Sequence, residues 1–397
     1  MKLSDHYILQ TIHGIPYLLP YGQAIAEYRK GVRLNETGVF LWKKLAMGYS
    51  QAELLESMAV HYHATKQELP ILEQDLKEFL SQLSFAGILQ KDTILPKPDY
   101  YFRIANITIG YSGNKEFLMP SLLDFSCDAL KEDKWKKRKQ KQLFILSSTN
   151  VLQKKIMGTL LIKTENLEII KTKDFYILCF PIQNYVKYCY LSFDGSLAYF
   201  YLHPSADTIP YISSEFQKLK QELFYAFRDA FLFFAQKQGL FALHSASLLY
   251  RNKAWLFAGA SGTGKSTHTN LWKQQYHTPI LNGDLNLCQT EKNHLTIYGM
   301  PWCGTSGIYK KKEYPIGGII LLQQSKKNKI ELLSADQKQL LISQRLISPF
   351  WTEELFLKNL QFAEIAEQKV PIFRLACNME ASAAKTAKAY IDKNFIL

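Results

Sequence analysis

The amino-acid sequence predicts a chain of mixed α+β and α/β class that is built from three parts. Residues 1–92 contain a small sheet followed by three helices, the order of a winged helix. Residues 99–236 contain short apolar and β-branched runs separated by turn residues, which indicate a β-rich middle domain. Residues 237–397 contain an apolar strand, a glycine-rich loop and a helix in succession, as a phosphate-binding P-loop requires. A chain of 397 residues is long enough for two or three domains.

Composition and charge narrow the classes of function. Because 47% of the residues are apolar and 13% are aromatic, the chain can build cores, and disorder is not its dominant state. The net charge of +13 favours anionic partners: nucleotide phosphates, an acidic peptide, nucleic acid or a membrane surface. The N-terminus lacks the apolar core of a signal peptide, and no run reaches the roughly 18 apolar residues of a membrane span. The six cysteines show no metal-site spacing and are typical of a reducing compartment, so we expect a cytoplasmic protein without a membrane partner.

The first 92 residues show local signals for each of their elements. A hairpin of two strands turns at His13–Gly14, and residues 23–33 can supply a third short strand. Asn35 is a candidate cap for the first helix, and S/T-x-x-E capping boxes at Ser50 and Thr65 predict the starts of the next two. The third helix carries apolar residues at 3-4-3 spacing on one face.

This N-terminal segment resembles the PqqD family, the recognition element of enzymes that modify ribosomally made peptides. The matching residues are Tyr17 to Gln23, Leu34 to Trp42, Leu54, Tyr62, Asp75, Phe79 and Gly87 to Leu89. The resemblance implies that a precursor's leader peptide binds as an added strand on a sheet edge, beside the third helix. The residues predicted to form that peptide-binding edge are Ala24, Ile25, Ala26, Glu27 and Tyr28. A DNA-binding winged helix is the alternative, but the third helix is acidic as well as basic, which argues against nucleic acid.

The middle segment gives fewer signals of function. Its short strands suggest an antiparallel sheet, and Glu215 to Lys237 reads as an amphipathic helix. The basic run from Lys131 to Lys141 is either a solvated loop or a patch that steers an acidic peptide or nucleic acid. No catalytic constellation is visible between residues 93 and 236.

The strongest motif is Gly259 to Ser266, which reads G-x-x-x-x-G-K-S. An apolar strand precedes it, and a segment without Gly or Pro follows it. Glycines allow the backbone to turn its N–H groups toward phosphate oxygens, and the following helix adds its N-terminal partial charge. The predicted nucleotide-binding residues are Gly259, Ser261, Gly262, Thr263, Gly264, Lys265, Ser266 and Thr267. In a solvent-facing loop, Lys265 would bridge the β- and γ-phosphates of ATP while Ser266 holds Mg²⁺; the alternative is an ordinary glycine turn.

The C-terminal segment resembles HPr kinase/phosphorylase and the related nucleotide fold of ATP-dependent phosphoenolpyruvate carboxykinase. The matching features are His244, the loop Gly259 to Ser266, Asp284, and Ile297 to Gly304. The resemblance implies transfer of the γ-phosphate of ATP to a serine hydroxyl. It gives Asp284 the role of metal ligand or base and places His244 beside the phosphates. HPr kinases assemble as hexamers, so the resemblance also admits a homo-oligomer.

Some residues depart from that family's pattern. Asp284 lies between Gly283 and Leu285 where the family has two adjacent aspartates, and Thr267 stands where it has Glu. These losses of charge leave the reversibility of transfer and the substrate open. His268, on the helix after the loop, can face solvent or the site, and Cys303 is either a nucleophile or a packed thiol.

Together the two resemblances predict a kinase of peptide biosynthesis. Its N-terminal domain would bind the leader of a precursor peptide, and its C-terminal domain would phosphorylate a Ser or Thr of the core, with Lys265, His244 and Asp284 as catalytic residues. Two alternatives stay open: a non-catalytic, nucleotide-gated peptide-binding scaffold and a small-metabolite kinase. The sequence names neither the peptide nor the oligomeric state.

Overall fold

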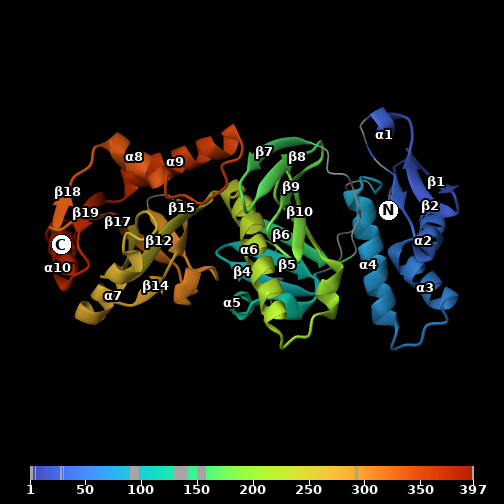
Figure 1. Cartoon of the computed structure of the whole chain (residues 1–397), viewed down its shortest axis with the longest axis horizontal. Coiled ribbons are helices and arrows are strands. Elements are labelled where there is room, and N and C mark those ends of the chain that lie inside the picture. Colours follow the sequence, from blue (N-terminus) through green and yellow to red (C-terminus); the bar gives the residue numbers. More distant parts are fainter. Residues whose placement is uncertain are drawn as a thin grey trace. The chain divides into compact units, whose positions relative to one another are not determined.

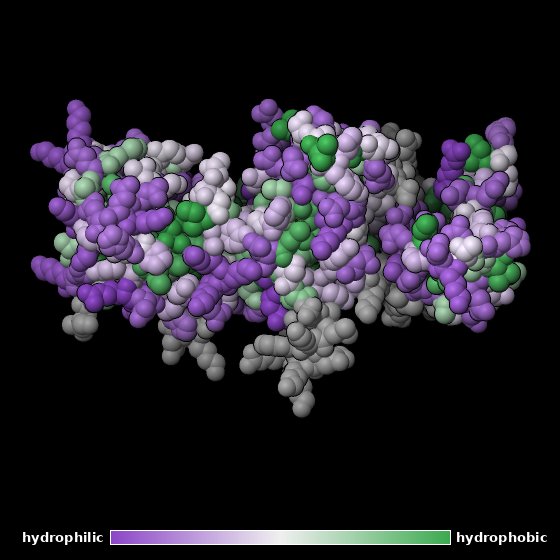
Figure 2. Space-filling model, turned by 90° about the horizontal axis from the view of Figure 1, so that it is seen from below, coloured by the Kyte–Doolittle hydropathy of each residue, from purple (hydrophilic) through white to green (hydrophobic). Residues whose placement is uncertain are grey.

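The computed structural model of the chain describes residues 3–4, 6–26, 29, 31–89, 98–127, 141–149, 158–290 and 294–395. The described residues form two compact units, one up to residue 89 and one from residue 98 onward (Figure 1). None of the helices in these ranges combines the length and the apolar character needed to cross a membrane. The face seen in Figure 2 is mostly hydrophilic and is broken by small hydrophobic areas.

The first unit is a three-stranded antiparallel sheet with helices. Its strands, in the order β1-β2-β3, are β1 (Tyr7–Ile12), β2 (Ile15–Pro20) and β3 (Val32–Arg33). Its helices are α1 (Gln23–Ala26), α2 (Glu36–Ala46), α3 (Gln51–His61) and α4 (Leu69–Phe85). One apolar core joins the sheet to the three longer helices, through residues such as Leu18, Leu41, Leu54 and Leu80.

Two of the three helix starts follow the local signals. The Asn35 side chain accepts a hydrogen bond from the Gly38 N–H at 2.7 Å, and both bonds of the Ser50 capping box are formed. The third start differs from the prediction. The Glu68 carboxylate accepts from the N–H and hydroxyl of Thr65, both at 2.8 Å, but these residues form a turn and α4 begins at Leu69. A proline in the first turn of α4 suits this later start.

The second unit begins with an eight-stranded sheet in the order β4-β5-β6-β11-β10-β9-β8-β7. The strands are β4 (Tyr100–Ile104), β5 (Ile107–Ser112), β6 (Lys141–Ser148), β7 (Thr159–Lys163), β8 (Glu168–Lys171), β9 (Phe175–Cys179), β10 (Val186–Ser192) and β11 (Leu197–Leu202). The sheet is mixed rather than antiparallel as predicted, because β6 pairs in parallel with both β5 and β11. The short helix α5 (Pro120–Leu123) lies between β5 and β6 in the chain, and residues 131–140 of the basic run lie outside the described residues.

A second sheet carries the glycine loop. Its strands are β12 (Leu240–Tyr250), β13 (Lys253–Ala258), β14 (Ile280–Asn282), β15 (Leu285–Thr290), β16 (Leu295–Tyr298), β17 (Tyr314–Gln324), β18 (Lys329–Glu331) and β19 (Ile372–Cys377). The helices of this part are α7 (Lys265–Tyr276), α8 (Ala335–Ser343), α9 (Glu353–Lys369) and α10 (Ala381–Phe395). The strands β13, β17 and β19 run parallel to one another, whereas β12 is antiparallel to β13 and to β15. The parallel strands therefore end at one edge of the sheet, where α/β folds bind their ligands.

The helix α6 (Ser214–Lys237) joins the two sheets into one unit. Its apolar residues share a core with strands of the first sheet and with Leu240, Leu285 and Trp302 of the second part (Figure 1). The Trp302 ring N–H also donates to the Phe224 carbonyl of α6 at 2.9 Å. Because of this common core, the domain boundary predicted between residues 236 and 237 does not separate two compact units.

Candidate functional site

The glycine loop connects the end of β13 to the start of α7. Gly262 and Gly264 have φ values of +77° and +95°, in the left-handed region that favours glycine. A Cβ on Gly259 would lie 2.5 Å from the Thr263 hydroxyl oxygen, so a side chain does not fit there. The Thr263 hydroxyl donates to the Ala260 carbonyl at 2.8 Å and holds the turn closed. A strand, a glycine-rich turn and a helix thus follow one another here in the order that the motif predicts.

Lys265 is the first residue of α7 and is buried, not solvent-facing as the sequence suggested. It is 8% exposed, and its ammonium donates to the carbonyls of Gly259 at 3.2 Å and Ala260 at 3.3 Å. Burial lowers the pKa of Lys265, the Asp284 carboxylate opposes that shift, and the nearby charge of Arg345 adds to it. The ammonium is therefore held inside the loop, within electrostatic reach of a carboxylate from another segment.

The pairing of β12 explains why these segments meet. On one side of β12, β13 ends with Ala258 opposite Ser245. On the other side, His244 lies opposite Leu285 of β15, and the Ser245 N–H donates to the Asp284 carbonyl at 3.0 Å. The glycine loop and the turn that carries Asp284 consequently leave the sheet at the same level of β12.

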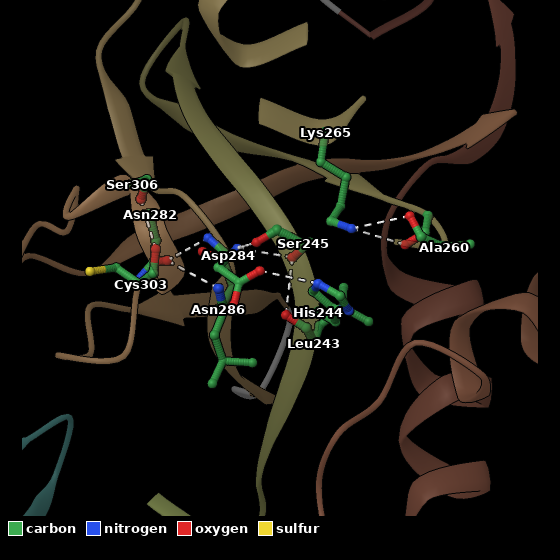
Figure 3. A network of polar contacts seen from close by, with 12 residues as sticks. Leu243, His244, Ser245, Ala260, Lys265, Asn282, Asp284, Asn286, Cys303 and Ser306 are labelled. Carbon is green, nitrogen blue, oxygen red and sulfur yellow. Dashed lines mark hydrogen bonds and ion pairs between the residues drawn. The ribbon is translucent and has the colours of Figure 1, made fainter. Parts of the chain in front are cut away.

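His244 and Asp284 form a direct pair at this level. The His244 Nε2 atom lies 3.1 Å from the Asp284 Oδ1 atom, and Figure 3 shows the Lys265 side chain directed toward them. The hydrogen bond from His244 lowers the pKa of Asp284; partial burial opposes this shift, whereas the charges of His244, Lys265 and Arg228 add to it. Asp284 is therefore an ionised carboxylate at neutral pH. Because an ionised carboxylate only accepts hydrogen bonds, the His244 ring nitrogen is the donor.

A network of buried amides and hydroxyls holds Asp284 in place. The Asn282 side-chain oxygen accepts from the backbone N–H groups of Asp284 at 3.0 Å and Leu285 at 3.1 Å. The Asn286 amide donates to the Ser245 carbonyl at 2.6 Å, and its oxygen accepts from the Ser247 hydroxyl at 2.7 Å (Figure 3). The turn at Asp284 is thereby tied to β12 by side chains as well as by strand pairing. Sequence reasoning did not assign these residues, although their alternation with apolar residues was a signal.

Arg345 is a second group that sequence reasoning missed. Leu346 forms an antiparallel bridge with Leu243, and the His244 N–H donates to the Arg345 carbonyl at 2.8 Å. Arg345 is therefore the cross-strand neighbour of His244, with its side chain on the same face. Its guanidinium is partly buried and has no hydrogen-bond partner among the described residues. No local motif marks this arginine, because it lies 101 positions after His244 (345 − 244) and depends on strand pairing.

The remaining predicted loop residues lie at the surface of the same segment. Ser261, Gly262 and Ser266 are exposed, and Thr263, Gly264 and Thr267 are partly buried. Within the described chain, no group of three or more His, Cys, Asp or Glu side chains could hold a metal ion.

The structure gives His268 and Cys303 packing environments. His268 is 1% exposed, its Nε2 atom lies 3.1 Å from the Cys377 sulfur, and its ring stacks on Phe257. Burial lowers its pKa to about 4, so the ring is neutral at pH 7. Cys303 is buried, and burial, with the Asp284 charge, raises the pKa of its thiol. Cys303 is therefore not an activated nucleophile, because a nucleophilic cysteine needs a lowered pKa. His268 is buried against Cys377 and Phe257 and packs in the core.

The predicted peptide-binding edge is not a strand where the structure describes it. Ala24, Ile25 and Ala26 belong to α1, while Glu27 and Tyr28 lie outside the described residues. Alanine is the best helix former, and the preceding Gly22 has a φ of +58° that turns the chain away from β2. The edge strands of this sheet are β1 and β3. An added strand would therefore pair with one of these two.

Comparisons with known proteins locate two similarities. Residues 24–89 match the model of the PqqD family, described as coenzyme PQQ synthesis protein D. The structure of TbiB1 in complex with the TbiA(beta) leader peptide is 23% identical and covers 24% of this chain and 100% of that chain, with a TM-score of 0.20. The Hpr(Ser) kinase/phosphatase from Coxiella burnetii is 11% identical and covers 38% of this chain and 93% of that chain, with a TM-score of 0.23. The search of curated proteins found no match. The family match confirms the PqqD resemblance that the sequence predicted for the N-terminal segment.

Proposed function

We propose that this protein is an ATP-dependent kinase that phosphorylates a Ser or Thr hydroxyl of a ribosomally synthesised precursor peptide. The observation that carries the proposal is the convergence of Lys265 with the His244–Asp284 pair beside the glycine loop. These residues come from three separate segments, so their convergence is not a consequence of the local motif. A cation, a carboxylate and a phosphate-binding glycine loop are the groups that phosphoryl transfer requires.

The residues of the site fit ATP and Mg²⁺. Backbone N–H groups of the glycine loop and the Lys265 ammonium would donate to phosphate oxygens, although the Thr263 N–H already donates to the Ala260 carbonyl and is not one of these donors. The exposed Ser266 hydroxyl and the ionised Asp284 carboxylate are oxygen ligands of the kind that Mg²⁺ prefers. When bound, the metal would neutralise negative charge on the phosphate oxygens.

The chain's own residues divide the remaining chemistry. His244 donates to Oδ1 of Asp284, which leaves the second carboxylate oxygen for the acceptor hydroxyl. That oxygen would accept the hydroxyl proton as the new O–P bond forms and the bond from the γ-phosphorus to ADP breaks. Lys265 and Arg345 would stabilise the charge that spreads over the transferred group. Most of the catalysis would then consist of positioning and charge stabilisation.

The N-terminal unit would supply substrate recruitment. Its match to the PqqD family supports binding of a leader peptide, and β3 offers an edge for strand addition. Just after β3, the Leu34 N–H donates to the Pro16 carbonyl of β2, so alternation along an antiparallel strand turns the Arg33 N–H outward. A tethered leader raises the local concentration of the core peptide, so weak contacts with the core would be sufficient.

Phosphate transfer to a peptide tests the catalytic half of the proposal. The probe is a peptide encoded beside the gene that carries a leader and a Ser-bearing core, with ATP labelled at the γ-phosphate. We expect labelled peptide with the wild type and none with Lys265→Ala, whose fold is checked by circular dichroism. ATP consumption without peptide would indicate a metabolite kinase. ATP binding without turnover would indicate the non-catalytic scaffold, the second candidate, which is favoured by the lack of an aspartate next to Asp284 in the sequence.

Leader affinity tests the recognition half. Proline at Arg33 would delete the outward N–H of β3 and leave the Leu34 bond to β2 in place. We expect Arg33→Pro to weaken binding of a fluorescent leader peptide in anisotropy measurements, whereas the matched Arg33→Ala variant keeps the N–H and binds well. Equal affinity of the two folded variants would exclude strand addition on β3.

A further inference from the structure

The order of strands around the glycine loop determines how a bound nucleotide would lie across the edge of the sheet. On one side of β13 lies β12, followed by the turn that carries Asp284. On the other side lie β17 and then β19, both parallel to β13. If the phosphates bind at the end of β13 and the reacting end points to Asp284, the nucleoside extends over the ends of β17 and β19. Carboxyl ends of parallel strands are the general ligand edge of such sheets.

The ends of β17 and β19 lie close beside the glycine loop. A Cβ on Gly259 would lie 3.3 Å from the Leu322 carbonyl of β17, and the Gln324 amide donates to the Gly262 carbonyl at 3.0 Å. Just after β19, the Met379 side chain lies near the start of α7, since a Cβ on Gly264 would be 3.6 Å from its terminal methyl group. Met379 is 52% exposed, so its thioether is accessible at this position.

The turn that carries Met379 is fixed by its neighbours. The Asn378 N–H donates to the Asn328 side-chain oxygen at 2.9 Å, and the Asn378 side-chain oxygen accepts from the Glu380 N–H at 3.1 Å. The Asn328 amide also donates to the Ser382 hydroxyl of α10 at 2.8 Å. An accessible, polarisable side chain on a fixed turn suits a flat aromatic ligand, because sulfur makes favourable contacts with aromatic rings.

We propose that the nucleobase of the bound triphosphate packs against Met379, over the carboxyl ends of β17 and β19. This proposal rests on the proposed function, because it assumes that the loop of residues 259–264 binds the phosphates. The site would then have two parts. The loop and Lys265 bind the phosphates, and a second part, which no sequence motif indicated, binds the nucleobase. Met379 then contributes to the affinity for a nucleotide and not to the affinity for its phosphates alone.

Calorimetric binding of ATP and of inorganic tripolyphosphate to the full chain tests this separation. The wild type should bind ATP more tightly than tripolyphosphate, which lacks the base. Met379→Ala should weaken ATP binding by about 3- to 10-fold, the range of one sulfur–aromatic contact, and should leave tripolyphosphate binding within about 2-fold. Unchanged tripolyphosphate binding also shows that the variant is folded. Met47→Ala is the matched control, since Met47 is 72% exposed and belongs to the N-terminal unit; it should change neither affinity.

Each other result overturns a defined part of the reasoning. If Met379→Ala binds ATP as the wild type does, or weakens both ligands equally, the base does not pack on Met379, although the nucleotide site stands. If the wild type binds tripolyphosphate as tightly as ATP, no base subsite exists. If the wild type binds neither ligand, the phosphate loop is not a nucleotide site, and the proposed function fails together with this inference.

Discussion

Replacing Asp284 by Asn separates the catalytic role of this carboxylate from its structural role. The amide has the same shape, so its oxygen can still accept the hydrogen bond from His244, and the Asn282 network that holds the backbone is unchanged. What is lost is the negative charge and the capacity to accept a proton. Phosphate transfer should therefore fall while the fold is retained.

The magnitude follows from the role assigned to the side chain. A positioned general base contributes about 10² to 10⁴ in rate, or roughly 3–5 kcal/mol of barrier. ATP affinity should respond in the opposite direction when metal is absent, because the Asp284 charge repels the triphosphate and its removal relieves that repulsion. The Asp284 carboxylate also opposes the lowering of the Lys265 pKa by burial, so the pKa of Lys265 should fall further in the variant.

The assay combines single-turnover transfer to the peptide with calorimetric ATP binding, each with Mg²⁺ and with a chelator. We expect Asp284→Asn to lose at least about 100-fold in transfer and to bind metal-free ATP no more weakly than the wild type. Asp336→Asn, at the start of α8, is the matched control, because it also removes one carboxylate charge but lies outside the site. This variant should transfer phosphate at the wild-type rate. Near-normal transfer by Asp284→Asn would show that the base lies elsewhere and would refute this account of the site.

Three further predictions address other parts of the site. Asn282→Ala leaves two backbone N–H groups without their acceptor, so urea unfolding should show a loss of about 2–4 kcal/mol; unchanged stability would mean that these bonds are not needed. Arg345→Ala should lower kcat by at least about 10-fold, with partial recovery in Arg345→Lys, whereas equal kcat in all three would remove Arg345 from the site. The folded-state pKa of His268, about 4, is below its unfolded value of roughly 6.5, so the unfolded chain binds its proton first as pH falls. Between pH 7.5 and 5 the wild type should therefore lose about 2 kcal/mol more stability than His268→Gln, and parallel pH profiles of the two proteins would contradict that pKa.

Features set by neighbours in the sequence were predicted well. The glycine loop depends on a few consecutive residues, and the positive φ values of Gly262 and Gly264 fall where the motif places glycines. The caps at Asn35 and Ser50 likewise involve residues three apart and are formed as predicted. Local signals were insufficient where two local preferences compete. At Ala24–Ala26 the helix preference of alanine prevailed over the short strand predicted within residues 23–33, and Val32–Arg33 of that range form β3.

Features set by strand pairing could not be predicted. The parallel pairing of β6 with β5 and β11 depends on which strands meet in the sheet, and these partners are separated by long stretches of sequence. The burial of Lys265 results from the way the loop closes around its ammonium, and a motif does not report exposure. Arg345 joins the site only because residues 345 and 346 pair with β12. The glycine loop is formed by consecutive residues, whereas the charged side chains around it come from distant parts of the sequence.

The position of the site follows from where strands end along β12. On one side of β12, pairing with β13 stops at Ser245 and the segment from Arg345 takes over at His244. On the other side, β14 and β15 are separated by the turn that carries Asp284.

Both neighbours of β12 thus have a break at one level, and backbone that leaves a sheet exposes polar groups that need partners. The Asn282 and Asn286 side chains meet that need within the Asp284 turn, and the N–H and hydroxyl of Thr263 meet it within the glycine loop by donating to the Ala260 carbonyl. Strand pairing on both sides of β12, rather than an adjacent second acidic residue, therefore fixes Asp284 relative to Lys265.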